Sequence, residues 1–161
     1  MGIDAEAEGA LYKALLAGGF RLRAGGKVLA TIADQDKDEA LPLLRELDQM
    51  GYHLYATAGT LARLSLAGVA ATPVHRIGER HPDIIDLIRD GTFDFVVNTI
   101  TRGGHQESEG FLIRRATVER GILCFTSLDT LKAAVTALRG RHQKSVSVRS
   151  LNQWLKVDAV Q

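Results

Sequence analysis

Residues 51–60 read GYHLYATAGT, and this stretch decides the fold that we expect. It joins a glycine, a β-rich run at 52–56 and the turn Ala-Thr-Ala-Gly-Thr at 56–60, after which leucines recur at helical spacing. A glycine just before a strand is the expected C-cap of the preceding helix, because it adopts the left-handed conformation without steric cost. The stretch therefore indicates a helix end, a strand, a turn and a helix start.

The same order of elements recurs along the chain. The other β-rich runs are KVLATI (27–32), TPVH (72–75), FDFVVN (93–98) and ILCF (122–125), and the other glycines before strands are Gly68, Gly91 and Gly121. The segments between them carry apolar residues three and four apart: Leu41, Leu44 and Leu47, then Leu61 and Leu64, then Ile84, Ile85 and Ile88, and last Ile113, Ala116 and Val118. Nearly continuous apolar strands are typical of a parallel sheet covered on both faces. The repeat predicts an α/β fold with parallel strands and right-handed crossovers.

Pro42 conflicts with one of the predicted helices. It lies inside the first helix of this repeat if that helix begins at Asp36. Since proline lacks the N–H group that a helix interior uses, the helix either begins nearer Glu39 or tolerates a kink.

The composition excludes several classes of protein. The chain has 161 residues, of which 45% are hydrophobic, enough for one domain with a proper core. With 20 basic and 19 acidic residues it lacks the basic excess of nucleic-acid or membrane-surface proteins. Cys124 is the single cysteine, and the five histidines show no metal-ligand spacing, so we expect neither disulfides nor a metal site. No apolar run or leader pattern indicates a membrane span or signal peptide, and we expect a cytoplasmic protein.

The two ends of the chain differ from its centre. Residues 5–17 carry a helical pattern, and the glycine-punctuated segment GGFRLRAGG follows at 18–26. After Arg139 the sequence becomes polar and basic. We therefore expect a linker helix at 1–19, an α/β domain at 20–140 and a C-terminal tail at 141–161.

Polar residues stand where the predicted strands end, and ligands of open parallel sheets bind outside these carboxyl ends. These residues are Thr31, Thr57, His75-Arg76, Asn98-Thr99 and Thr126-Ser127. In the turn after the second strand, Gly59 lets the backbone approach a ligand closely, and N–H groups point from a helix start, which suits a phosphate. Lys37 and Arg76 supply positive charge at the same edge. The joint pattern predicts an anion site.

Single residues of this pattern have plainer interpretations. Thr57 and Thr60 are equally well explained as helix caps. The pair Arg114-Arg115 is most simply a solvated surface with an interface or salt-bridge role. The polar segment 101–106 either folds over a ligand or is only a long loop.

The chain from Lys27 to about Arg139 resembles the C-terminal allosteric domain of the carbamoyl-phosphate synthase large subunit, a methylglyoxal-synthase-like domain. The motifs that carry the resemblance are KVLATIADQDK (27–37), GYHLYATAGT (51–60), HPDIIDLIRDGTFDFVVNT (81–99) and IRRATVERGILCFTSLDT (113–130). The resemblance implies a three-layer α/β/α sandwich with a five-stranded parallel sheet, no cofactor and no catalysis by the domain itself. It implies binding of nucleotide effectors of the UMP or IMP type and a nearby ornithine site, in pyrimidine and arginine biosynthesis. The implied partners are the synthetase domains of the large subunit and the glutaminase small subunit, with self-association left open.

The resemblance also assigns roles to residues by motif position. It implies phosphate contacts from Lys37, Thr57 and Thr60, with Gly59 between them and Arg76 where the family often has lysine. It implies that Asn98 and Thr99 meet the ribose and base, that Thr31 adds a hydroxyl and that Glu109 fills an acidic position. Thr126 matches a threonine that faces the ornithine site. Ile100 replaces a hydroxyl residue of some members, which affects the preference for base or ribose.

Two other functions compete with effector binding. Methylglyoxal synthase, which acts on dihydroxyacetone phosphate, resembles the same fold but needs an aspartate base in a Gly-Gly-Asp-Gln run. This chain reads Gly-Glu-Arg-His-Pro-Asp at 78–83, where Asp83 is better explained as a cap of the next helix. The second alternative is an oligomerisation module that binds no effector.

Overall fold

The computed structural model describes residues 1–19, 25–100, 109–143 and 148–155. It divides into two compact units, Arg21–Lys132 and the two ends Met1–Phe20 with Ala133–Gln161. The unit made from the ends contains helix α1 (Ala7–Ala17), the later part of α6 (Leu128–Gln143) and α7 (Leu151–Leu155). In it the Lys13 ammonium lies 2.7 Å from the Asp4 carboxylate and over the Trp154 ring. The predicted linker helix, central domain and tail, with limits at residues 19 and 140, stay a prediction.

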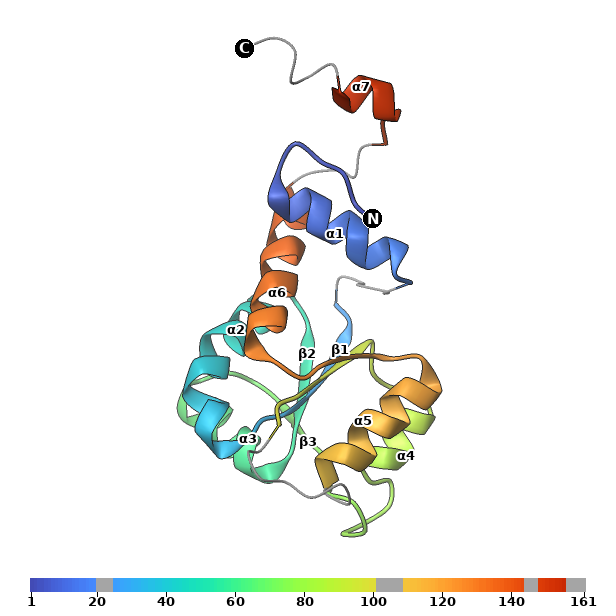
Figure 1. The fold of residues 1–161 in the computed structure, drawn as a ribbon. Helices are drawn as coiled ribbons and strands as arrows, with labels where there is room; N and C mark the ends of the chain where they lie inside the picture. The colour runs from blue at the N-terminus through green and yellow to red at the C-terminus, as the bar shows by residue number, and fades with distance from the viewer. Residues whose placement is uncertain (20–24, 101–108, 144–147, 156–161) are drawn as a thin grey trace. The chain divides into compact units, whose positions relative to one another are not determined.

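The central unit is built on a five-stranded parallel sheet with strand order β3-β2-β1-β4-β5 (Figure 1). Its strands are β1 (Lys27–Thr31), β2 (His53–Ala56), β3 (Thr72–Pro73), β4 (Phe95–Asn98) and β5 (Leu123–Phe125). Each strand is shorter than the β-rich run that predicted it. The α/β class, the strand number and the parallel direction are confirmed.

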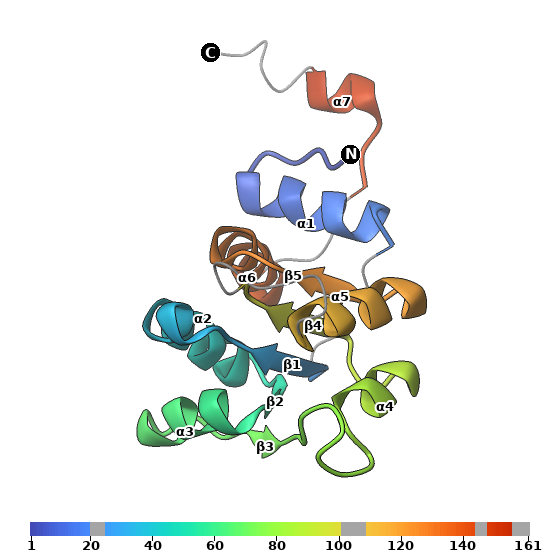
Figure 2. The same ribbon diagram turned by 60° about the horizontal axis from the view of Figure 1, so that its bottom comes forward.

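The helices of this unit lie on both faces of the sheet. They are the 3-10 turn η1 (Asp34–Asp36), α2 (Lys37–Gln49), α3 (Ala58–Leu66), α4 (Ile84–Arg89), α5 (Glu109–Arg120) and the start of α6. Helices α2 and α3 cover one face, and α4 and α5 cover the other (Figure 2). This arrangement confirms the three-layer sandwich.

The four glycines between helices and strands end their helices as predicted. Gly51, Gly68, Gly91 and Gly121 all have positive φ, between 70° and 83°. After each of them the next N–H group donates to a carbonyl five residues earlier, as Tyr52 N does to Leu47 O at 3.0 Å. This bond closes the last helical turn, so the left-handed glycine directs the chain back toward the sheet.

Pro42 is tolerated inside its helix. Helix α2 begins at Lys37, before Glu39, and contains the proline. The missing N–H group costs one hydrogen bond near the start of the helix, and the buried residues Ala40, Leu44 and Leu47 hold the helix on the sheet.

The core fills the space between the sheet and its helices. All of β4 and all but the first residue of β1 are buried, as both faces of these central strands are covered. One cluster, lying between strands β1 and β4 and helices α4 and α5, contains Leu29, Val74, Ile84, Ile88, Phe93, Val96, Ile113 and Ala116. Val118 was expected on this apolar face but is 77% exposed, because the buried face of α5 continues through Thr117. Among the described residues no helix is long and apolar enough to cross a membrane.

Candidate functional site

A pocket of about 1180 Å³ opens at the carboxyl ends of the strands. The chain runs outward from β1 to β2 and β3, then crosses back so that β4 lies on the other side of β1. Ligands of doubly wound sheets bind where the strand order reverses in this way. All nine residues predicted for the effector site line this one pocket: Thr31, Lys37, Thr57, Gly59, Thr60, Arg76, Asn98, Thr99 and Glu109. Ile100 also lines it, whereas Thr126 is exposed after β5 and does not.

Two threonine hydroxyls hold the loop that forms the floor of the pocket. Thr60 Oγ1 accepts a hydrogen bond from Ile32 N at 3.1 Å, and Thr99 Oγ1 accepts one from Ala33 N at 2.8 Å. Both threonines are buried. Because each hydroxyl accepts in these bonds, its own hydrogen is available to donate. The loop after β1 is thus fixed from the β2 side and the β4 side.

The start of α3 forms one wall of the pocket. Thr57 is the N-cap residue, but its side chain accepts no capping hydrogen bond. The capping interpretation is therefore wrong for Thr57, and the Thr60 hydroxyl serves Ile32 instead. Lys37 Nζ lies 2.9 Å from where a Cβ on Gly59 would stand, so only glycine admits the ammonium so close to this turn. Helix-start N–H groups beside an ammonium are favourable for an anion.

Three side chains at the base of the pocket are joined by hydrogen bonds. Asn98 Nδ2 donates to Thr31 Oγ1 at 2.6 Å, and Arg114 Nη1 donates to Asn98 Oδ1 at 2.7 Å. Thr31 Oγ1 in turn donates to the Val97 carbonyl at 3.4 Å. Thr31 and Asn98 are both buried, so this chain of bonds fixes how the amide of Asn98 is oriented.

Arg114 is a pocket residue that the sequence interpretation missed. The sequence predicted that Arg114 and Arg115 both lie on the solvated surface. Only Arg115 does, where its Nε lies 2.8 Å from Glu119 Oε1. Arg114 shares a helical face with Gly110, buried Ile113 and Thr117. That three-and-four spacing was the available signal, because it places Arg114 at the edge of the buried side of α5.

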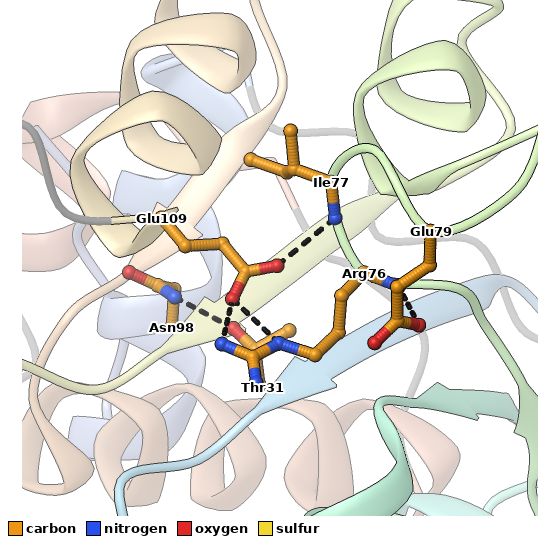
Figure 3. A network of polar contacts seen from close by, with 6 residues as sticks. All are labelled: Thr31, Arg76, Ile77, Glu79, Asn98 and Glu109. Atoms are coloured by element: carbon orange, nitrogen blue, oxygen red, sulfur yellow. Dashed lines mark hydrogen bonds and ion pairs between the residues drawn. The ribbon is translucent and has the colours of Figure 1, made fainter.

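The lining of the pocket also includes an ion pair between Arg76 and Glu109 (Figure 3). Arg76 Nε and Nη2 both donate to Glu109 Oε2, at 2.8 and 2.5 Å, while Glu109 Oε1 accepts from Ile77 N at 3.0 Å. Glu79 Oε2 accepts from the Arg76 backbone N–H at 3.0 Å. The hydrogen bonds that Arg76 donates to Glu109, and then the charge of Glu109, raise the pKa of Arg76.

Lys37 is also paired. Its ammonium lies 2.5 Å from Asp34, whose carboxylate is almost fully exposed. The hydrogen bond and the charge of Lys37 lower the pKa of Asp34. Both cations that the sequence predicted for the site are thus shared with carboxylates of the same pocket, while the hydrogen bond of Arg114 goes to a neutral amide.

Asp83 caps helix α4 just outside the lining of the pocket. Its carboxylate accepts from Gly78 N at 3.0 Å, Ile85 N at 2.9 Å and Asp86 N at 3.1 Å. In return, Asp86 Oδ2 accepts from Asp83 N at 3.0 Å. Burial by itself would raise the pKa of Asp83, but the three backbone N–H groups together lower it. This capping box confirms the predicted role of Asp83 at the helix start.

His81, Asp83 and Asp86 bring three potential metal ligands within 4.8 Å of one another. The carboxylates already accept the capping bonds, and His81 Nδ1 lies 2.5 Å from Asp86 Oδ2. Asp86 raises the pKa of His81, first through their hydrogen bond. The hydrogen bonds of the helix start and of His81 with Asp86 therefore account for how these three side chains are placed.

Fold and site together define an α/β domain with a polar pocket at the switch point of a parallel sheet. The family model of the MGS-like domain matches residues 39–126, more than half of the chain. The chain belongs to the MGS-like domain family. The match includes β2 through β5 and the turn at 56–60, whereas Thr31 and Lys37 precede it.

Proposed function

We propose that this domain is a regulatory module that binds a phosphorylated nucleotide in the pocket. The observation that carries the proposal is the start of α3. There the side chain of the N-cap residue, Thr57, makes no capping hydrogen bond, and the Lys37 ammonium lies beside Gly59. This wall offers helix-start N–H groups, hydroxyls and a cation to one anionic group. A volume of about 1180 Å³ leaves space for a nucleoside beyond the phosphate.

The pocket supports binding better than catalysis. A general base needs a carboxylate or imidazole within hydrogen-bond reach of the proton that it removes. The carboxylate of Asp83, just outside the lining, is held by three backbone N–H groups. The lining carboxylates are also engaged: Asp34 by Lys37, Glu79 by the Arg76 N–H group, and Glu109 by Arg76 and Ile77. These contacts favour a domain that is not an enzyme on its own over a methylglyoxal synthase.

The parent protein in this proposal is a glutamine-hydrolysing carbamoyl-phosphate synthase. The domain would belong to its large subunit, next to the synthetase domains and the glutaminase small subunit, and UMP or IMP would be the effector. Thr126, outside the pocket, would contribute to a separate ornithine site. The support is the motif resemblance together with the shared MGS-like family.

Calorimetric titration of the full chain with UMP, IMP and ornithine tests the proposal. Replacement of Lys37 by alanine removes a charge-assisted hydrogen bond and should weaken nucleotide binding by about tenfold or more. Lys27→Ala is the matched control, because Lys27 is exposed at the opposite end of β1 from the pocket. Absence of nucleotide binding at millimolar concentration, or an equal loss in both variants, would refute the proposal. Formation of methylglyoxal from dihydroxyacetone phosphate at an enzymatic rate would favour the enzyme instead.

A further inference from the structure

We propose that Glu109 competes with the anionic group of the ligand for Arg76. The Arg76–Glu109 pair thereby lowers the affinity of the pocket for every anion, and phosphate esters are the ligands that still bind. The inference rests on the proposed function and concerns the specificity of that same pocket. It starts from the observation that the most exposed cation of the site, Arg76, is held by a carboxylate from another element.

The geometry of the pair leaves it open to exchange. Both donating nitrogens of Arg76 converge on one oxygen, because Ile77 N–H occupies the other oxygen of Glu109. The guanidinium and carboxylate therefore do not form the parallel two-bond arrangement that makes such pairs strong. The two bonds come from Nε and Nη2, so Nη1 takes no part in the pair with Glu109. The Arg76 side chain is 59% exposed, so solvent weakens the pair further.

A phosphate ester is a better partner for Arg76 than Glu109 is. It carries a charge of about −1.5 to −2 at neutral pH and has three terminal oxygens, which can accept two parallel bonds from a guanidinium. A ligand with a single carboxylate exchanges one carboxylate for another and gains little. The competing Glu109 thereby sets a threshold of charge and geometry that phosphate meets and a carboxylate does not.

Displacement of Glu109 would have a local structural signature. Glu109 is the first residue of α5, and its second oxygen holds the Ile77 N–H of the segment between β3 and α4. A ligand that takes Arg76 frees the carboxylate to move, so the Ile77 amide changes its partner or its bond length. Ile77 N–H therefore reports on the exchange without being a pocket-lining group itself.

The test compares Glu109→Gln with wild type by NMR titration of the full chain with inorganic phosphate, acetate and UMP at low ionic strength. Exposed ion pairs are worth up to about 1 kcal/mol, so the variant should bind phosphate about two- to fivefold more tightly. The affinity for acetate should rise by a similar factor, because a competitor that either ligand must displace weakens both by the same factor. In wild type the Ile77 amide resonance should shift along the phosphate titration, with the same midpoint as the Gly59 amide.

Two controls separate competition from a general change of charge or stability. Glu79→Gln also removes one negative charge near Arg76, but it leaves the guanidinium paired with Glu109. This variant should therefore gain less phosphate affinity than Glu109→Gln does. In an Arg76→Gln background, Glu109→Gln should give none. The competitor role is refuted if Glu109→Gln leaves phosphate affinity unchanged or weakens it, or if the gain survives in the Arg76→Gln background. In either case the proposed function still stands as long as the wild-type chain binds the nucleotide. Absence of phosphate and UMP binding in every variant refutes both.

Discussion

Removal of the Asp83 carboxylate should destabilise the protein strongly without touching the pocket. Asp83→Ala deletes the acceptor of three backbone N–H bonds at a residue that is 5% exposed. Loss of an N-cap costs about 1 kcal/mol, and an unsatisfied buried N–H group costs about 1–3 kcal/mol more. We therefore expect a loss of about 2–4 kcal/mol in the free energy of unfolding. For a chain of this length, that loss lowers the melting temperature by roughly 4–16 °C.

Thermal and urea unfolding followed by circular dichroism measure this loss. Asp90→Ala is the control, because Asp90 is exposed at the other end of α4, and it should stay within about 0.5 kcal/mol of wild type. The lowered pKa of Asp83 gives the expected pH dependence. Its stabilisation is complete above the unfolded value of 3.8 and is lost as the pH falls through the lower folded value, so the alanine variant should lose less stability in acid. Equal stability of the two variants would refute the capping argument.

Three further substitutions test other parts of the structure. Gly59→Ala places a Cβ 2.9 Å from Lys37 Nζ, and calorimetry should show weaker nucleotide binding with an unchanged or slightly raised melting temperature. Gly51→Ala forces a side chain into φ of 83° and should cost about 1–2 kcal/mol in urea unfolding, and an unchanged stability would contradict the C-cap assignment. Val118→Lys changes a side chain that is 77% exposed and should leave stability within about 0.5 kcal/mol, whereas a large loss would mean that the residue is covered.

The fold could be predicted because its signals are local. Each glycine before a strand needs only its own φ and the bond that closes the preceding helix, and both are properties of a few neighbouring residues. The buried β4 is recognisable from its continuous apolar residues for the same reason. The buried position of Val118 was predicted wrongly. The apolar spacing of α5 alone does not decide whether Thr117 or Val118 lies on the buried face.

The positions of the site residues could also be predicted, but their pairing could not. Parallel strands bring their carboxyl ends to one edge, so Thr57 and Asn98 had to come close once the topology was right. Whether Arg76 is available or held by Glu109 depends on residues 33 positions apart in the chain. Arg114 was missed for a related reason, since its role depends on a hydrogen bond to Asn98 across two elements.

This difference between position and pairing bears on how the pocket would hold an anion. The two cations of the pocket, Lys37 and Arg76, suggest a site that attracts anions through its charge. However, each of them lies against a carboxylate of the same pocket. The net attraction at a distance is therefore weak. Affinity must come from short-range hydrogen bonds donated by Lys37 and the α3 start, in a pocket whose loop after β1 is held by the Thr60 and Thr99 hydroxyls. Such a site discriminates by fit more than by charge, because a ligand is held only where its oxygens match fixed donors. It follows that raised ionic strength should weaken binding less than the loss of the Thr60 hydroxyl does, since salt screens exposed pairs but not a buried hydrogen bond.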